Sequence, residues 1–360
     1  MKRILITFAG GQLGRSITRA LRADGPVHII AADADGYALF QSDGDERYII
    51  PMADDPDYMN VLRDLVKKTQ PDLVWPMHDK EIGRVVADTE PIGARTFLPP
   101  RRTVEICHDK FESFKAFKAA GVPVPETIMV NSEGDLKEAF RRFDGHIWLR
   151  PVSGAGGRGA LGTDNPELAL IWMKSFDGWG HYSAAERLAA RGHTFESVWR
   201  DGELIAAQAN SRKVGMERPV GTLVQGPPPG LGLRRRYGAE PVVSEVAIAA
   251  IHAVTDGRPH GIYSVDMNSD RNGHPCVTEI NIGRFGMSGA IVYYNHGANF
   301  PAIAMRTAFG DDLGFEPPLL QPLHTDVAVV LSIGHQPVEV LDTEYEALQS
   351  EYRDRISKLR

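Results

Sequence analysis

The chain has 360 residues, a formal net charge of −7 at pH 7 and 42% hydrophobic residues. This length is enough for two or three domains with sizeable cores, and the composition is that of an ordinary globular protein. The negative charge argues against a general nucleic-acid-binding protein, whose surface must neutralise phosphates. Two cysteines exclude a disulfide framework and a cysteine-rich metal site. No apolar run reaches membrane-spanning length, and the short apolar stretch after Met1 predicts the first strand of a cytoplasmic protein.

The first elements form a βαβ unit. The apolar run Ile4–Ala9 leads into Gly10-Gly-Gln-Leu-Gly14, a helix extends through Leu21, and Val27–Asp33 is the next strand. The glycine turn and the acid after the second strand imitate a dinucleotide fingerprint, with Asp33 positioned for a ribose hydroxyl. The full G-x-G-x-x-G pattern is not present, however, and a tight strand-to-helix turn needs glycine for packing alone. Both interpretations stay open at this point.

The alternation of strands and helices continues to about residue 107. Strands are predicted at 47–51, 72–76 and 96–99, with a helix over 58–68. Residues 78–81, His-Asp-Lys-Glu, follow the carboxyl end of the second of these strands. Alternating elements of this kind predict a parallel sheet covered on both faces, which is an α/β domain.

The next helix begins at Asp109, which can cap it, and Glu112 can complete a capping box. Lys110 therefore lies in the first turn, where the positive end of the helix dipole repels it. A bound anion would remove this conflict. The alternative is an exposed lysine that costs a few tenths of a kcal/mol.

A glycine-rich loop follows the strand that begins near His146. This strand places a cation at Arg150, and Pro151 then breaks it. Gly154, Gly156, Gly157 and Gly159 follow, with Arg158 among them. Glycines this dense let backbone N–H groups approach an anion, so the loop predicts either a polyphosphate site or a plain surface turn.

The following segment contains residues 182–188 and a strand hairpin, 194–199 and 203–208, with Asp201-Gly202 as its turn. Residues 211–240 are rich in Gly, Pro and Arg. They predict either a solvated loop or a loop that closes over an anionic substrate. A helix is predicted over Glu245–Val254.

Two carboxylates are expected to face each other in a second hairpin. Asn272-Gly273 predicts a two-residue type I′ turn between residues 262–268 and 275–281. Counting outward from this turn places Asp266 opposite Glu279, with Cβ atoms about 5 Å apart. Asn281 points to the same face. Opposed carboxylates repel unless a cation lies between them, and oxygen ligands of this kind suit Mg²⁺. The alternative is an exposed face on which charges happen to oppose.

Lys110, Arg150 with its glycine loop, Glu186 and the Asp266…Glu279-Ile-Asn281 pattern occur in the order of the ATP-grasp superfamily, which the chain resembles over about residues 1–315. It looks closest to the carboxylate–amine ligase branch, which includes D-alanine–D-alanine ligase and the carbamoyl phosphate synthetase units. The resemblance implies a mixed α/β and α+β chain: a Rossmann-like domain without a dinucleotide, then an ATP-grasp fold of two α+β subdomains. The implied boundaries are 1–107 for the Rossmann-like domain, 108–185 for a lid subdomain with the glycine loop, 186–320 for the catalytic subdomain with the metal site, and 321–360 for a C-terminal strand and helix.

The resemblance also implies roles for single residues. ATP phosphates would contact Lys110, Arg150 and the loop residues Ser153, Gly154, Gly156 and Gly157. The adenine would meet Glu186, Arg187 and Leu188, and the ribose would meet Glu196. Mg²⁺ would be held by Asp266, Glu279 and Asn281. Three departures stand out: Arg150 replaces a lysine found in many members, His193-Thr194 replaces the family's glutamate, and Asn281-Ile-Gly-Arg284 is one residue longer than the usual Asn-Pro-Arg.

The resemblance therefore implies an ATP- and Mg²⁺-dependent ligase, with one or two metal ions and with Mn²⁺ able to substitute. A small-molecule carboxylate would form an acyl phosphate, and an amine would displace phosphate to give an amide. Arg150 and Arg284 are the expected catalytic residues, with Arg284 stabilising oxyanion charge. Whether the chain forms a homodimer stays open. The rival functions are a nicotinamide-dependent oxidoreductase, which leaves the Asp266/Glu279 pair unexplained, and a non-catalytic ATP-binding regulator.

Overall fold

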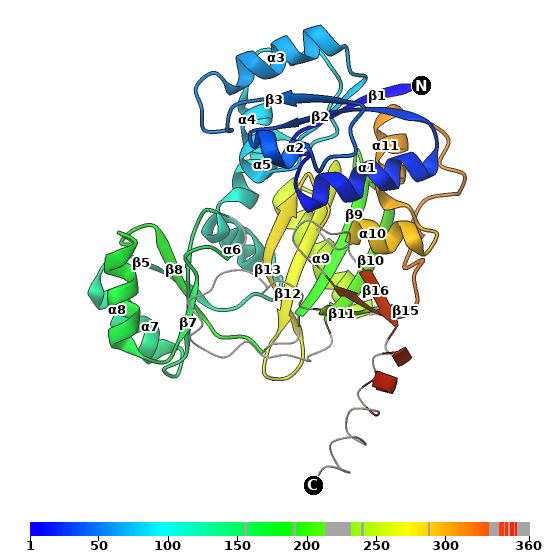
Figure 1. The fold of residues 1–360 in the computed structure, drawn as a ribbon. Coiled ribbons are helices and arrows are strands. Elements are labelled where there is room, and N and C mark those ends of the chain that lie inside the picture. The colour runs from blue at the N-terminus through cyan, green and yellow to red at the C-terminus, as the bar shows by residue number, and fades with distance from the viewer. Residues whose placement is uncertain are drawn as a thin grey trace, which may run out of the picture.

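The computed structural model describes residues 1–154, 157–189, 192–212, 232–238, 241–286, 289–330, 338–341, 343–344, 346–348 and 350. Within these residues the strands form three sheets. Figure 1 shows the N-terminal sheet above a large central sheet, with a small sheet to one side. None of the helices in the described ranges combines the length and the apolar character that crossing a membrane requires.

The N-terminal domain is built on a parallel sheet of order β3-β2-β1-β4. Ile4, Leu5 and Ile6 of β1 are all fully buried, and they contribute alternately to the cores on the two faces of the sheet. This explains why the strand is a continuous apolar run. The elements are β1 (Lys2–Ile6), α1 (Gln12–Asp24), β2 (Val27–Asp33), α2 (Gly36–Leu39), β3 (Glu46–Ile49), α3 (Tyr58–Thr69), β4 (Leu73–Trp75) and α4 (Asp79–Ala87).

The strand predicted at residues 96–99 does not form. Arg95 makes a single bridge to Leu73 beside β4, and no ladder continues from it in the described chain. The short apolar segment was too brief for its composition to settle its structure.

The glycine turn between β1 and α1 is explained by close packing. A Cβ atom on Gly10 would lie 2.4 Å from the carbonyl carbon of Ala38, and one on Gly14 would lie 2.6 Å from Cα of Ala9. The Asp33 carboxylate accepts hydrogen bonds from the backbone N–H groups of Gly10 and Asp35, both at 3.0 Å. Asp33 is 5% exposed, so this acid holds the turn together and is not presented to a ribose.

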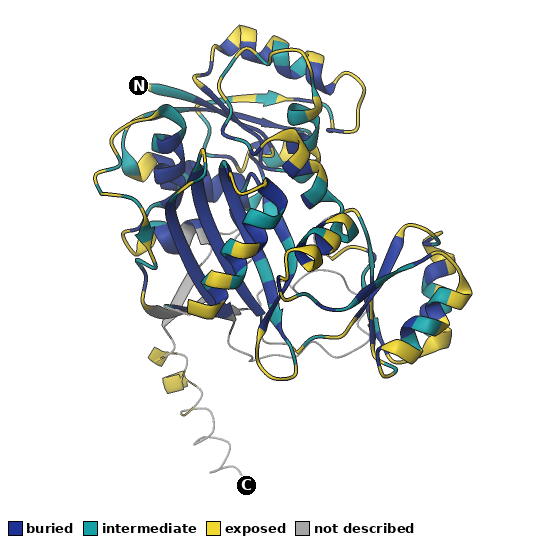
Figure 2. Cartoon of the chain, turned by 180° about the vertical axis from the view of Figure 1, so that it is seen from behind, coloured by how far each residue is buried: buried dark blue, intermediate teal, exposed yellow. Residues whose placement is uncertain are grey.

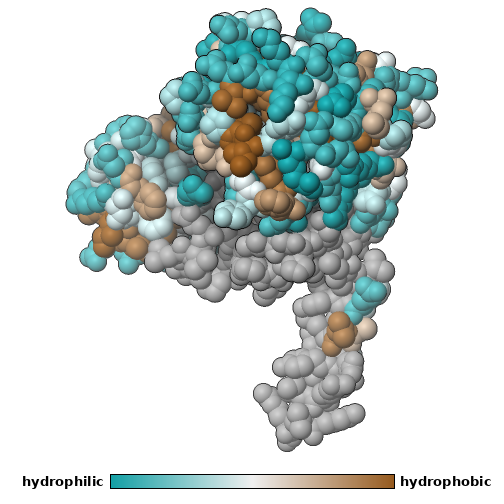
Figure 3. All heavy atoms as spheres, turned by 45° about the horizontal axis from the view of Figure 1, so that its top comes forward, coloured by the Kyte–Doolittle hydropathy of each residue, from teal (hydrophilic) through white to brown (hydrophobic). Residues whose placement is uncertain are grey.

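Figure 3 shows an apolar patch on the N-terminal domain. The large apolar side chains that this domain exposes include Phe8, Phe40, Ile49 and Met52. Phe8 lies just beyond the carboxyl end of β1. Part of the exposed apolar surface therefore lies at the sheet edge that also carries the start of α4.

The helices α5 (Arg101–His108) and α6 (Lys110–Ala119) connect the N-terminal domain to the rest of the chain. Val104 of α5 and Phe117 of α6 are buried in the core of the central sheet. Asp109 caps α6 by accepting hydrogen bonds from the N–H groups of Phe111 and Glu112. The helix that carries Lys110 thus packs on the central unit, although we expected it in the lid subdomain.

The small sheet, called the lid sheet here, has the antiparallel order β5-β8-β6-β7. Ile147 and Leu149 of β6 are buried with two helices on one face, and Trp148 and Arg150 alternate with them on the other. Its elements are β5 (Thr127–Val130), α7 (Glu133–Arg142), β6 (Ile147–Pro151), β7 (Leu161–Thr163), α8 (Pro166–Ser175) and β8 (Tyr182–Glu186).

The central sheet has the order β13-β12-β9-β10-β11-β15-β16, and β14 pairs with β10. Figure 2 shows that its middle strands are buried along most of their length. The elements are β9 (Gly192–Arg200), β10 (Glu203–Arg212), β11 (Gly232–Tyr237), α9 (Pro241–Thr255), β12 (Gly261–Ser269), β13 (Pro275–Ile282), α10 (Gly289–Asn295), α11 (Phe300–Phe309), β14 (Leu319–Leu320), β15 (Thr325–Val330) and β16 (Val338–Leu341). The strands of the C-terminal segment therefore extend this sheet, although we expected them to stand apart from the catalytic subdomain.

The carboxylate hairpin has the predicted pair but not the predicted turn. Asp266 is opposite Glu279, as expected. Nearer the turn, however, Ser269 is opposite Pro275 and Asn268 is opposite Cys276, a shift of one residue from type I′ pairing. Asp270 organises the longer loop, because its carboxylate accepts the N–H groups of Asn272 and His274. A bulge between Asp266 and Met267 restores the register.

Candidate active site between the lid sheet and the central sheet

A cavity of about 330 Å³ lies between the lid sheet and the central sheet. Nine of the predicted site residues line it: Lys110, Arg150, Ser153, Gly154, Gly157, Glu186, Arg187, Leu188 and Glu279. They come from α6, β6, the glycine loop (residues 152–160), β8 with the segment after it, and β13. Segments far apart in the sequence thus converge on one space with an apolar part and a strongly charged part.

Lys110 links α6 to the glycine loop. Its backbone N–H donates to the carbonyl of Val152 at 2.7 Å, and its Nζ donates to the carbonyl of Gly154. Nζ also lies 3.7 Å from Oε2 of Glu279. The lysine that seemed misplaced at a helix N-terminus therefore lines the cavity, with a carboxylate as its partner.

Arg150 reaches from the lid sheet to the central sheet. Its Nη1 donates to the carbonyl of Thr278 at 3.0 Å, and its Nε is buried without a partner among the described residues. Burial lowers the pKa of Arg150, and the nearby Glu279 carboxylate opposes that shift. A guanidinium with an unused donor in a cavity wall is suited to an additional anion.

The segment after β8 carries the chain from the lid sheet to the central sheet. The Glu186 N–H donates to the carbonyl of Glu126, and the Glu186 carboxylate accepts the Glu126 N–H at 2.9 Å. The Ala189 N–H then donates to the carbonyl of Ser269 at the end of β12. The backbone of residues 186–188 is held at both ends and forms one wall of the cavity.

The three predicted metal ligands lie together on the central sheet. Asp266 accepts a hydrogen bond from Thr194 Oγ1 at 2.8 Å and another from Asn281 Nδ2 at 2.9 Å. Glu279 lies opposite Asp266 and has the Lys110 ammonium as its ion-pair partner. Within the described ranges, no three His, Cys, Asp or Glu side chains gather as a metal site. The three predicted ligands comprise two carboxylates, Asp266 and Glu279, and one amide, Asn281.

Arg284 connects this set to the N-terminal domain. Its Nη2 donates to Oδ1 of Asn281 at 2.7 Å, and its Nε donates to Oδ1 of Asp79 at 2.7 Å. Burial opposes ionisation of Asp79, but the charge and hydrogen bond of Arg284 outweigh it and lower the pKa of Asp79. Burial also opposes the charge of Arg284, and Asp79 outweighs it and raises the pKa of Arg284.

Arg284 does not line the cavity, and neither do Asp266 and Asn281. They lie beside Glu279, on the side toward the N-terminal domain, where Asp79 begins α4. The site thus has two adjoining parts. Lys110, Arg150 and the glycine loop line the cavity, and Asp266, Asn281 and Arg284 form a polar cluster beside it.

The predicted ribose contact of Glu196 needs a correction. Glu196 is 1% exposed, and its carboxylate accepts hydrogen bonds from the Gly286 N–H and the Tyr293 hydroxyl. It does not line the cavity. The acid lies on the face of β9 that packs toward α10, where it fixes the chain that follows Arg284.

Trp148, Arg158 and Asn268 are among the cavity residues that were not predicted as site residues. Trp148 is 40% exposed and shares its face of β6 with Arg150, so the two-residue period of a strand could have identified it. Arg158 lines the cavity from the glycine loop. Asn268 lines it from β12, two residues along the strand from Asp266. Of the predicted residues, Gly156 lies outside the described residues, as does most of the segment 211–240.

Comparison with known proteins adds three findings. A family model described as "PylC-like, N-terminal domain" matches residues 4–92. Comparison with the curated proteins found no match. Similar solved structures cover nearly all of the chain.

An L-amino acid ligase from Bacillus licheniformis has a TM-score of 0.68 at 15% identity, covering 92% of this chain and 80% of its own. N5-carboxyaminoimidazole synthetase from Staphylococcus aureus, complexed with ADP, has a TM-score of 0.69 at 14% identity, covering 98% and 86%. Biotin carboxylase from Campylobacter jejuni has a TM-score of 0.67 at 17% identity, covering 91% and 75%. The chain thus has the fold of ATP-grasp ligases, and the resemblance seen in the sequence is confirmed at the level of the fold.

Proposed function

We propose that this protein is an ATP- and Mg²⁺-dependent ligase that joins a small-molecule carboxylate to an amine. The observation that carries the proposal is the convergence of Lys110, Arg150, the glycine loop and Glu279 on one cavity, next to Asp266, Asn281 and Arg284. Phosphoryl transfer asks a protein mainly to position groups and to neutralise charge. The cavity and its polar neighbour contain the groups for both tasks.

The two parts of the cavity fit the two parts of a nucleotide. The adenine would lie against Leu188 and Trp148, beside the backbone of residues 186–188. The polyphosphate would lie toward Lys110, Arg150 and the amides of the glycine loop. Several of the similar solved structures are complexes with an adenine nucleotide, among them one with ADP and one with ATP, which supports a nucleotide site in this fold.

The chemistry of the donor set fits Mg²⁺. Carboxylate and amide oxygens are hard ligands, and Mg²⁺ uses few protein carboxylates and completes its shell with water and phosphate oxygens. Asp266, Glu279 and Asn281 would hold the ion. Bound there, it would neutralise charge on the β- and γ-phosphates.

The chain's own residues would act on the substrates. Arg150 and Lys110 would hold the γ-phosphate in line with an attacking substrate carboxylate, giving an acyl phosphate and ADP. Arg284, oriented by Asp79 and Asn281, would stabilise the oxyanion that forms when the amine attacks the acyl carbon. Phosphate then leaves, and the amide remains.

The two rival functions each have one observation against them. A nicotinamide-dependent oxidoreductase would need Asp33 for the ribose, but Asp33 holds the glycine turn. A non-catalytic ATP-binding regulator would not need the Arg284–Asp79 ion pair, which holds a cation beside the expected γ-phosphate position.

The ligase proposal predicts that ADP release requires two substrates. We expect ATP hydrolysis alone to be slow and ADP release to rise at least about tenfold when a suitable carboxylate and amine are both present. A coupled ADP assay over pairs of amino acids, short peptides and amines would find the pair, and mass spectrometry should detect one amide per ADP. ADP release that one compound alone stimulates fully, without any amide, would contradict ligation.

A further inference from the structure

At the start of α1, three side chains each have a buried polar atom that forms no hydrogen bond with the described residues. They are Gln12 through Nε2, Arg15 through Nε, and Ser16 through Oγ. Residues three and four positions apart share one face of a helix, so all three occupy one face of the first two turns. Buried polar groups are nearly always hydrogen-bonded, and three exceptions on one face need an explanation.

Arg15 is the most informative of the three. It is 7% exposed, and its guanidinium forms no hydrogen bond or ion pair with any described residue. The two other arginines of α1 behave differently: Arg19 pairs with Asp43 at 2.7 Å and Arg22 pairs with Asp45 at 2.8 Å, and both are much more exposed. The helix thus pairs its exposed cations and leaves its buried cation without a partner in the described part of the chain, the reverse of what stability alone would select.

The local backbone also favours an anion. The N-cap residue of α1 is Gly11, which has no side chain to accept a hydrogen bond from the first N–H groups. The first turn also contains no acidic residue. The first N–H groups of a helix lack partners within it and attract negative charge. Side chains on a helix lean toward its N-terminus, so the Arg15 guanidinium is directed over the turn that carries these N–H groups.

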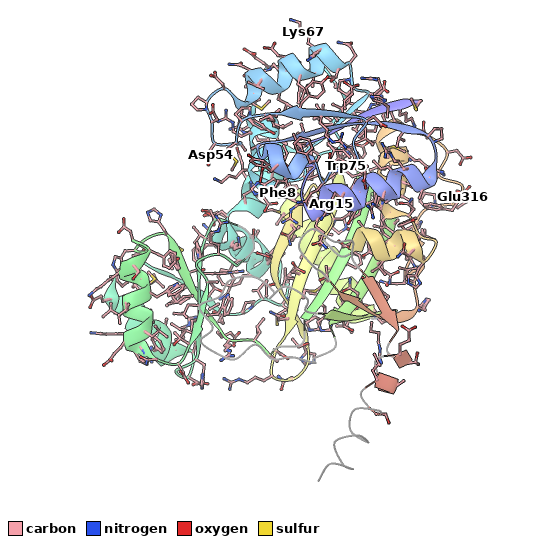
Figure 4. All side chains as sticks on the ribbon, in the orientation of Figure 1. Phe8, Arg15, Asp54, Lys67, Trp75 and Glu316 are labelled. Carbon is pink, nitrogen blue, oxygen red and sulfur yellow. The ribbon has the colours of Figure 1, made fainter. Side chains whose placement is uncertain are left out.

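The location connects this cluster to the proposed active site. α1 begins at the carboxyl edge of the N-terminal sheet, and Asp79, which binds Arg284, follows β4 at the same edge. α10, which follows Arg284 along the chain, packs against α1. Figure 4 labels Arg15 and Phe8 on the side of the N-terminal domain that faces the central sheet. The cluster therefore lies at the edge of the N-terminal sheet that also carries Asp79, the partner of Arg284.

We propose that Gln12, Arg15 and Ser16 bind an anionic oxygen group of the substrate, either a carboxylate or a phosphate, separate from the carboxylate that is activated. This proposal rests on the proposed ligase function in assigning the anion to a substrate. The site selects for substrates with a second negative group. A bound oxyanion would accept hydrogen bonds from all three side chains and would neutralise the buried arginine.

Thermal unfolding with small anions tests the site without knowledge of the substrate. The protein is saturated with ADP and Mg²⁺ to fill the nucleotide cavity, and phosphate or succinate is titrated at constant ionic strength. We expect one of these anions to raise the melting temperature of the wild type. Arg15→Met should lose most of this rise, while the matched variant Arg19→Met, on the same helix, should keep it.

Without added anion, Arg15→Met should melt at or above the wild-type temperature, because it removes a buried unpaired charge. Arg15→Lys and Ser16→Ala repeat the test if the methionine variant does not fold, and each should weaken the anion response severalfold. An equal response in all variants, or no response to either anion, would overturn the proposal. Comparing melting temperatures with and without ADP separates the two proposals. If ADP does not stabilise the protein but the anion responses of the variants are as expected, the ligase function fails and the anion site stands.

Discussion

Glu279→Gln is expected to reduce ADP release at least about 100-fold while leaving the fold intact. The substitution keeps the size and hydrogen-bonding capacity of the side chain but removes the charge that would hold Mg²⁺ against the phosphates. It also relieves repulsion with Asp266, directly opposite on β12. The ion pair with Lys110 is lost, but the Glu279 side chain is 34% exposed, so solvent weakens this pair. We therefore expect the free energy of unfolding to change by less than about 1 kcal/mol.

The measurement is melting temperature and ADP release on the same preparation. Glu203→Gln is the matched control, because Glu203 lies on the same sheet with only a 3.7 Å contact to Arg200. It should change neither quantity. A structural acid at 279 would behave differently: stability would fall and the remaining activity would follow the folded fraction. That outcome would remove Glu279 from the metal site.

Arg284→Met is expected to lower turnover by about 10²- to 10³-fold, the usual effect of removing one oxyanion-stabilising donor. It should also destabilise the protein by about 3 kcal/mol, because it leaves Asp79 as an uncompensated buried charge. The side chains of Arg284 and Asp79 are 16% and 24% exposed, and Nε lies 2.7 Å from Oδ1. The same guanidinium is thus expected to support both turnover and stability.

A second variant separates these effects. Asp79→Asn combined with Arg284→Met removes both charges, so the free energy of unfolding should recover most of the loss. Turnover should stay low, because the cation beside the acyl carbon is still missing. Denaturant titrations and ADP release on both variants provide the comparison. Recovery of turnover together with stability would show that Arg284 is only structural.

Much of the fold could be predicted because local sequence determines it. Ile4–Ile6 is a continuous apolar run since both faces of its sheet are covered, and Asp109 is a cap that any helix of this kind would use. The Asp266–Glu279 pair was predicted correctly from a turn that does not form. The longer loop around Asp270 shifts the register by one residue, and the bulge shifts it back.

The parts that could not be predicted depend on contacts across the chain. Asp79 and Arg284 are 205 residues apart, and no local pattern indicates that one orients the other. Glu196 was assigned to the ribose by the family resemblance, although His193-Thr194 replaces the family's glutamate; the alternation of β9 turns it toward α10 and the chain after Arg284. The lack of partners at Arg15 depends on which residues surround α1, and this requires coordinates.

Titration of nucleotides by calorimetry tests the central claim, which is that ATP binds between the lid sheet and the central sheet with a divalent cation held by Asp266 and Glu279. We predict that the wild type binds ATP at least about tenfold more tightly with Mg²⁺ than without it. Glu279→Gln should lose most of that gain, and NAD and NADP should not bind. Binding of NAD in place of ATP, or ATP binding that neither Mg²⁺ nor Glu279→Gln alters, would contradict the claim.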